Sequence, residues 1–160
     1  MSIRTFHKVL KKITIILALV MVFAGGVYAA GVDSALIIRP KDSTAFAVDK
    51  GNSDALLARG EQLWNDKSLS KKGKTACSSC HKTSTKMFKT TFLETYPHYV
   101  KMASKKAKLD SITAEGMVQF CMVVPMKNEP LPWDSEDLAA LTAYSEGVIQ
   151  QKYIEAKAAK

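Results

Sequence analysis

The residues best suited to chemistry stand together in the motif Cys77-Ser78-Ser79-Cys80-His81. Two thiols three positions apart can each add across one vinyl group of a haem, and the adjacent imidazole can then coordinate the iron. Such a CxxCH motif is typical of covalent attachment of haem c. The sequence contains it once, so we predict one haem c held by Cys77 and Cys80, with His81 as the proximal iron ligand.

Two other uses of paired cysteines fit the sequence less well. A thioredoxin-type redox pair needs a βαβ unit around it, and no such pattern flanks Cys77 and Cys80. A structural zinc site needs a second pair of ligands, and only Cys121 and His98 follow the motif. The haem interpretation is therefore favoured over both.

The distal iron ligand is the open question. Cys121 and Met126 lie 40 and 45 positions after His81, and either sulfur could reach the iron from the other side. A thioether favours ferrous iron and raises the reduction potential, whereas a thiolate places negative charge on the iron and lowers it. Cys121 could also be a small buried hydrophobe, as free cysteine often is. The other candidates are Met122, Met117 and His98.

Two amphipathic helices are predicted, one on each side of the motif. The first covers residues 53–66, and its apolar face contains Gly60. The second opens at residues 134–137 with a cap and two first-turn acids, and its apolar stripe contains Tyr144. A glycine opposite an aromatic lets two helices cross closely, so we expect Gly60 to contact Tyr144.

The other elements are expected to be short and helical, with few strand signals. Ser53 or Asp54 is the expected N-cap of the first helix, and Pro97 is expected in the first turn of another. His98 is expected at the surface or near a haem propionate, and Trp133 near a propionate or at the rim of the core. We expect loops over residues 65–76 and 127–132, and helices over residues 99–106 and 113–122.

These features resemble class I cytochrome c, whose first and last helices cross in this way. The resemblance covers about residues 53–150 and depends mainly on the CxxCH motif. It implies an all-α, cytochrome c-like helical domain around one covalently bound haem.

A second resemblance concerns the distal side. The stretch Gln119-Phe120-Cys121, followed by residues 131–144, is similar to the haem domains of SoxA, the thiosulfate-oxidising subunit of the SoxAX cytochromes. In that family a cysteine at this place ligates the haem opposite the CxxCH histidine. The resemblance thus implies Cys121 as the favoured distal ligand, with Met126 as the alternative. Related small His/Cys-ligated cytochromes bind small gases, which suits a single short domain.

The first 29 residues have the pattern of a secretory signal. A basic start is followed by an uncharged run over residues 13–27 and by small residues at Val27 and Ala29. We expect cleavage after Ala29, or after Ala30, and a periplasmic protein. In the alternative, the segment stays uncleaved and anchors the protein, since the uncharged run approaches the roughly 20 residues that span a bilayer.

Length and composition fit one globular domain: 160 residues, of which 47% are hydrophobic and 24% charged. The predicted organisation is a signal peptide over residues 1–29, an N-terminal extension over 30–52, a cytochrome c domain over 53–150 and a helical tail over 151–160.

The net charge of +8 is unevenly distributed. Between Lys67 and Lys108 there are eleven lysines and a single acid, Glu94. Such a surface near a haem edge would steer an acidic redox partner, which could be another cytochrome subunit. Nucleic acid is not expected, because the run lacks interleaved stacking aromatics. Membrane contact is expected only if the N-terminal segment is uncleaved.

We therefore predict a periplasmic monohaem c-type cytochrome that transfers single electrons through iron ligated by His81 and by Cys121 or Met126. Electron transfer or ligand binding is expected rather than catalysis. The alternative is a SoxA-like haem-thiolate module or subunit for the chemistry of sulfur compounds or of a small gas such as NO or CO.

Overall fold

The computed structural model describes residues 31–81 and 90–159 of the chain. Every described residue belongs to one compact unit, Gly31–Lys160. The predicted signal peptide therefore lies outside the described residues. Within residues 31–81 and 90–159, no helix has the length and apolar character needed to cross a membrane.

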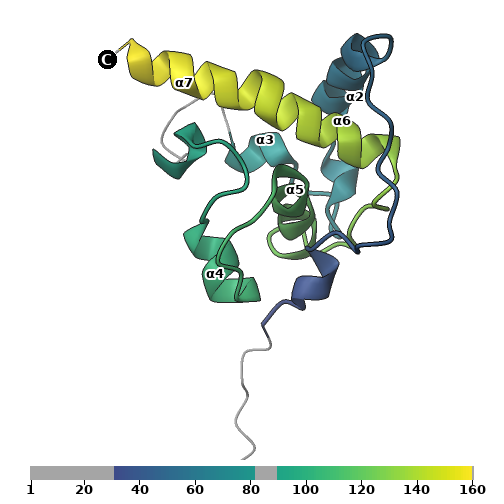
Figure 1. Ribbon diagram of the computed structural model, residues 1–160, viewed down its shortest axis with the longest axis vertical. Coiled ribbons are helices and arrows are strands. Elements are labelled where there is room, and N and C mark those ends of the chain that lie inside the picture. Colours follow the sequence, from purple (N-terminus) through teal and green to yellow (C-terminus); the bar gives the residue numbers. More distant parts are fainter. Residues whose placement is uncertain (1–30, 82–89, 160) are drawn as a thin grey trace, which may run out of the picture. The chain divides into compact units, whose positions relative to one another are not determined.

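The described chain is all-α, as predicted (Figure 1). Its extended pairing, in the residues that the structure describes, is limited to one isolated antiparallel bridge between His98 and Ile112. The short 3-10 turns are η1 (Ser34–Leu36), η2 (Lys67–Leu69) and η3 (Thr90–Leu93). The α-helices are α2 (Ser53–Asn65), α3 (Cys77–Cys80), α4 (Lys101–Ala107), α5 (Ala114–Val123), α6 (Glu136–Tyr144) and α7 (Gln151–Ala158).

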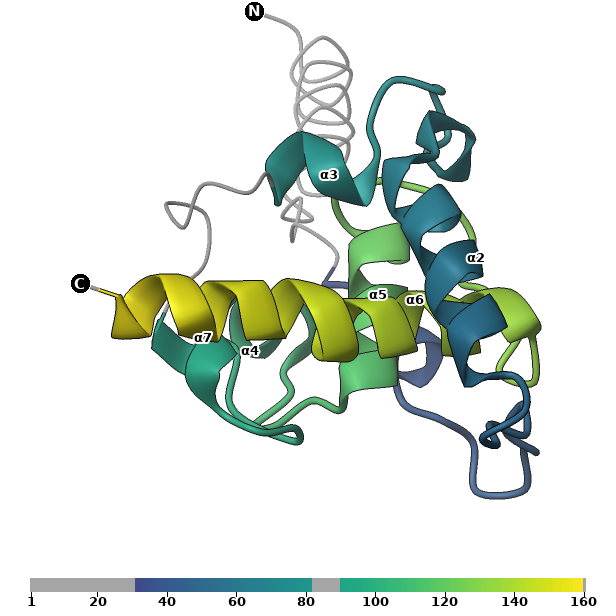
Figure 2. The same ribbon diagram turned by 90° about the horizontal axis from the view of Figure 1, so that it is seen from above.

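The largest helix contact is the crossing of α2 and α6, which Figure 2 shows from above. A methyl group added at Gly60 would meet the carbonyl oxygen of Ala140 and lie 2.5 Å from the Cβ atom of Tyr144. The predicted contact between Gly60 and Tyr144 is confirmed. The buried side chains around this crossing form one core cluster: Leu56, Leu63, Trp64, Ala140, Leu141 and Tyr144.

The N-terminal cap of α6 is as the sequence predicts, whereas that of α2 is not. Ser135 caps α6 by accepting a hydrogen bond from the Leu138 N–H at 3.2 Å, and two acids occupy the first turn. The prediction of Ser53 or Asp54 as the N-cap of α2 is wrong, because Asn52 stands there. The Asn52 side chain donates to the Ala47 carbonyl instead, so it closes the preceding loop rather than the helix end.

The helices α4 and α5 flank the bridge between His98 and Ile112. Thr113 caps α5 by accepting a hydrogen bond from the Gly116 N–H at 3.0 Å, close to the predicted start. The expectation of Pro97 in the first turn of a helix is wrong, because α4 begins only at Lys101. The preceding residues pair with the segment before α5, and the Tyr96–Pro97 peptide bond is cis.

The segments before α2 and after α6 both pack onto the same compact unit. Ile37 belongs to a second core cluster with Ala103, Ala107, Ile112 and Phe120. At the other end, α6 continues through the π-helical segment η4 (Ser145–Gln150) into α7. Tyr153 of α7 is buried, and its ring meets Phe92 edge to face at 5.6 Å between centroids. This packing fixes the C-terminal helix over the η3 turn.

Candidate functional site

The helix α3 is a single turn that carries both thiols of the CxxCH motif. The Ala76 N–H donates to Ser79 Oγ at 2.9 Å, and the Ser79 N–H donates back to the Ala76 carbonyl at 3.0 Å. The His81 N–H closes the turn on the Cys77 carbonyl at 2.9 Å. Since residues three apart on a helix are neighbours, Cys77 and Cys80 share one side of the turn. The local backbone thus presents two thiols together.

His81 follows this turn and stands beside the α2–α6 crossing. Its ring centroid lies 5.9 Å from that of Trp64, and Trp64 lies 5.9 Å from Tyr144 of α6. Burial lowers the pKa of His81, which favours the neutral imidazole. Neutral imidazole is the form that binds metals. The packing of α2 on α6 therefore supports the side chain that we expect to hold the iron.

Cys121 lies on α5, and both views place α5 beside α3 (Figures 1 and 2). Burial raises the pKa of the Cys121 thiol to about 12, and the charges of Cys77 and Cys80 raise it as well. These electrostatic interactions indicate that the three sulfurs lie near one another. Cys121 therefore lies near the two thiols of the attachment turn.

Met126 lies in the loop after α5, where its side chain is only 4% exposed. The Met126 N–H donates to the Cys121 carbonyl at 3.1 Å. Its own carbonyl accepts from the Lys71 N–H at 3.1 Å, which joins this loop to the one before α3. Met122, the other methionine near Cys121, is buried on α5. Both methionines thus belong to the packed interior.

Gln119 positions the helix that carries Cys121, a role that the sequence analysis did not predict. Its side chain is fully buried. Its Nε2 donates to the Leu131 carbonyl at 2.6 Å, and its Oε1 accepts from the Leu131 N–H at 2.8 Å. This paired hydrogen bond fastens α5 to the loop that leads into α6.

The structure contradicts the surface expectation for His98 and agrees with the rim position expected for Trp133. His98 is only 8% exposed and its ring stacks on Tyr96, with 4.3 Å between centroids, so the surface expectation is wrong. The bridge to Ile112 turns this residue inward. Trp133 lies under the guanidinium of Arg39 at 5.0 Å from the ring centroid, at the rim of the fold. Arg39 also donates to the Trp133 carbonyl at 2.9 Å.

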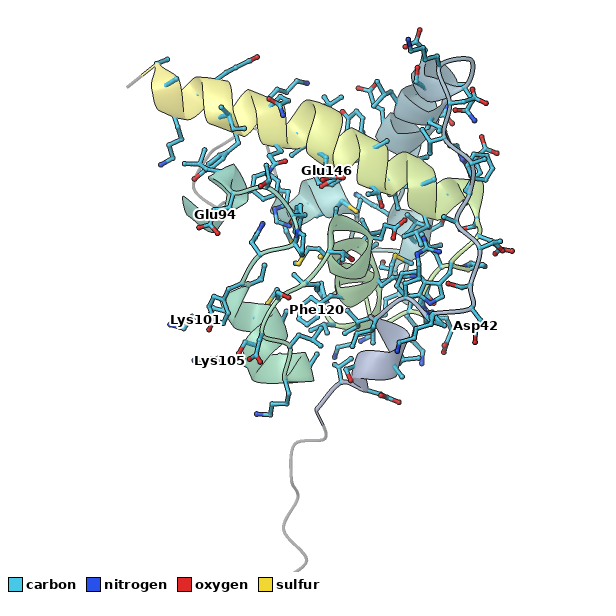
Figure 3. The ribbon with its side chains drawn as sticks, viewed as in Figure 1. Asp42, Glu94, Lys101, Lys105, Phe120 and Glu146 are labelled. Carbon is cyan, nitrogen blue, oxygen red and sulfur yellow. The ribbon has the colours of Figure 1, made fainter. Side chains whose placement is uncertain are left out.

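A polar group that sequence reasoning missed lies between η4 and α5. Burial raises the pKa of Glu146, and Figure 3 shows this side chain directed from the C-terminal helix toward α5. Burial also raises the pKa of Tyr96, with further contributions from Cys121 and Glu146. Tyr96 and Glu146 are therefore neighbours of the Cys121 side of the site, although 50 positions separate them in sequence.

A family model described as SoxA/TsdA, cytochrome c domain, matches residues 59–149, more than half of the 160-residue chain. The chain belongs to this family. The match includes the CxxCH turn, Cys121 and the α2–α6 crossing. Neither the curated proteins nor the solved structures searched include a significant match. Membership makes this SoxA/TsdA-type chain a c-type cytochrome, whose domain carries covalently bound haem c.

The described residues of this SoxA/TsdA-type cytochrome fit such a group. All three cysteines are free thiols, so neither Cys77 nor Cys80 is consumed by a disulfide. Both lie on one turn, as attachment to two vinyl groups requires. His81 follows directly, and burial lowers its pKa, which favours the neutral form. Cys77 and Cys80 would hold the haem covalently, and His81 would bind its iron.

Proposed function

We propose that this cytochrome is a periplasmic one-electron carrier with a single haem c, ligated by His81 and by Cys121. When bound, haem supplies a reversible one-electron change at its iron. The single CxxCH motif supports one haem, and the signal-like N-terminal 29 residues support export. The lysines between Lys67 and Lys108 support an acidic protein as the redox partner.

The place of Cys121 on α5, beside the attachment turn α3, is the observation that carries the distal assignment. The shared electrostatic influence of Cys77 and Cys80 on the Cys121 pKa agrees with this proximity. Met126 is the alternative ligand, because its loop is tied both to Cys121 and to Lys71 ahead of the motif. A thiolate at this position would favour ferric iron and a low potential, and a thioether would favour the reverse.

Spectra and reduction potentials of matched variants test this ligation. We expect the wild type and Met126→Ala to share a low midpoint potential, and Cys121→Ala to lose it. Leu138→Ala controls for lost packing, since Leu138 is equally buried and has no atom that could bind iron. A methionine charge-transfer band with a high potential that survives Cys121→Ala would contradict the thiolate assignment. Absence of covalent haem after periplasmic expression with the maturation machinery would contradict the function as a whole.

A second candidate function follows from the family match together with Cys121. Both favour a SoxA-like haem-thiolate module or subunit, acting on sulfur compounds or binding a small gas. Exposure of the reduced protein to CO or NO distinguishes it from a simple carrier. A carrier keeps its spectrum, because both axial positions are occupied. A change abolished in Cys121→Met, which offers a thioether in place of the thiolate, would favour the second function.

A further inference from the structure

The outer face of α4 carries an exposed apolar centre among lysines. Tyr99 and Met102 are 49% and 45% exposed. On a helix, positions three or four apart are neighbours, so Met102 lies between Lys105 and Lys106, and Lys101 adjoins Lys105. Figure 3 shows Lys101 and Lys105 projecting outward from this helix. We call these five residues the α4 surface.

Local helix stability accounts for Lys105 and Lys106, which lie in the last turn of α4, but not for Lys101. Val100 is the N-cap and makes no side-chain capping bond, although Ser, Thr, Asp or Asn would be preferred there. Lys101 places a cation at the positive end of the helix dipole, and Lys101 with Lys105 forms a like-charged pair at four positions. Residues 95–109 contain no acid to balance them. The positive charge of the α4 surface is therefore unbalanced along the local chain.

The inner face of α4 connects this surface to the functional site. Ala103 and Ala107 are buried and belong to the same core cluster as Phe120 of α5. Phe120 directly precedes Cys121, so the α4 surface lies one helix layer outside the proposed distal ligand.

We propose that the α4 surface is the docking site for an acidic electron-transfer protein. The inference rests on the proposed one-electron function and adds the place at which the partner binds. An apolar centre with a charged rim is the usual anatomy of a specific protein interface. The lysine rim, which has no acid within residues 95–109, selects a partner that presents carboxylates around an apolar or aromatic contact.

Reduction of the holoprotein by an acidic plant-type [2Fe–2S] ferredoxin, used as the probe, tests this surface. We expect Lys101→Glu/Lys105→Glu to lower the second-order rate constant about tenfold at low ionic strength and to converge with wild type at high ionic strength. The control Lys71→Glu/Lys72→Glu changes the net charge equally on exposed residues before α3, and we expect a smaller decrease. Equal losses in both variants, or no loss at Lys101 and Lys105, would overturn the proposal.

The proposal can also be tested without changing any charge, by a variant of Met102, and without measuring electron transfer, by the Met102 methyl resonance. Met102→Gln keeps every lysine, so we expect weaker ferredoxin binding with unchanged salt dependence. The wild-type Met102 methyl resonance should shift on addition of ferredoxin, and an unshifted resonance would overturn the proposal. Reduction by dithionite and the midpoint potential should be the same in all variants. A wild type without a reversible one-electron couple would instead contradict the proposed function, and the docking inference with it.

Discussion

Gly60 of α2 lies so close to Tyr144 of α6 that a methyl group on Gly60 would stand 2.5 Å from the Tyr144 Cβ atom. Tyr144 packs on Trp64, and Trp64 packs on His81. The close approach of two helix backbones is therefore connected through two aromatic rings to the expected iron ligand.

Gly60→Ala should destabilise the protein by about 1–3 kcal/mol or more, because the added methyl group meets backbone rather than a flexible side chain. Urea unfolding of the holoprotein measures this loss. The matched control is Gly147→Ala, whose added methyl group would have Leu57 Cδ2 at 3.7 Å as its nearest neighbour. It should be neutral or stabilising by up to about 1 kcal/mol through helix propensity. Equal destabilisation by both variants would contradict the tight crossing.

Gln119→Leu should cost about 2–4 kcal/mol of unfolding free energy, since it leaves the N–H and carbonyl of Leu131 without their partner. Thermal or urea unfolding gives the value. The control Gln62→Leu replaces an exposed glutamine on α2 and should have little effect. A loss at Gln119 no larger than at Gln62 would show that this hydrogen bond contributes nothing.

Arg39→Met should cost about 1 kcal/mol, because it removes a two-bond ion pair with Glu115, at 2.7 and 3.1 Å. The remaining alkyl chain can still cover Trp133. Unfolding at low and at high salt separates the contribution of the ion pair from that of the packing on Trp133. The difference between Arg39→Met and wild type that comes from the ion pair should shrink as salt rises. Arg59→Met, which removes the more exposed pair with Asp137, should cost less. The reverse order would contradict a stabilising role for Arg39.

Glu146→Gln should make the stability of the protein less dependent on pH. Burial raises the pKa of Glu146 in the folded state above its ordinary value of 4.5, so the folded state binds the proton more tightly than the unfolded state. Stability from this group is thus full below the ordinary value and is lost as pH rises through the folded value. The variant should melt higher than wild type at pH 7 and nearly equally at pH 4. A difference confined to acid pH would contradict this sign.

Much of the fold follows from local patterns in the sequence. Apolar periodicity predicts the face of α2 that packs on α6, and the small Gly60 predicts the partner of Tyr144. The helix expected over residues 99–106 is observed as α4, but Pro97 lies ahead of it rather than in its first turn, because this segment pairs through His98 and Ile112.

Part of the candidate site can be predicted from the sequence and part cannot. The CxxCH turn can be predicted because haem attachment requires a fixed local spacing of the two cysteines and the histidine. The approach of Tyr96 and Glu146 to Cys121 cannot be predicted from the sequence, because tertiary packing brings together segments that share no sequence pattern. The hydrogen bonds between Gln119 and Leu131 are not predicted either, because they join two segments that only tertiary packing brings together.

The segment ahead of α2 determines how this domain can be transplanted. Ile37 fills a core position, Arg39 binds both Glu115 and Trp133, and the Val32 N–H donates to the Lys106 carbonyl at 2.9 Å. A fusion protein that begins at residue 53 would lack Ile37 and would therefore expose the second core cluster to solvent. It would also lack Arg39, which holds the loop before α6 through Trp133. The smallest portable unit for grafting this cytochrome onto another chain therefore includes residues 31–52.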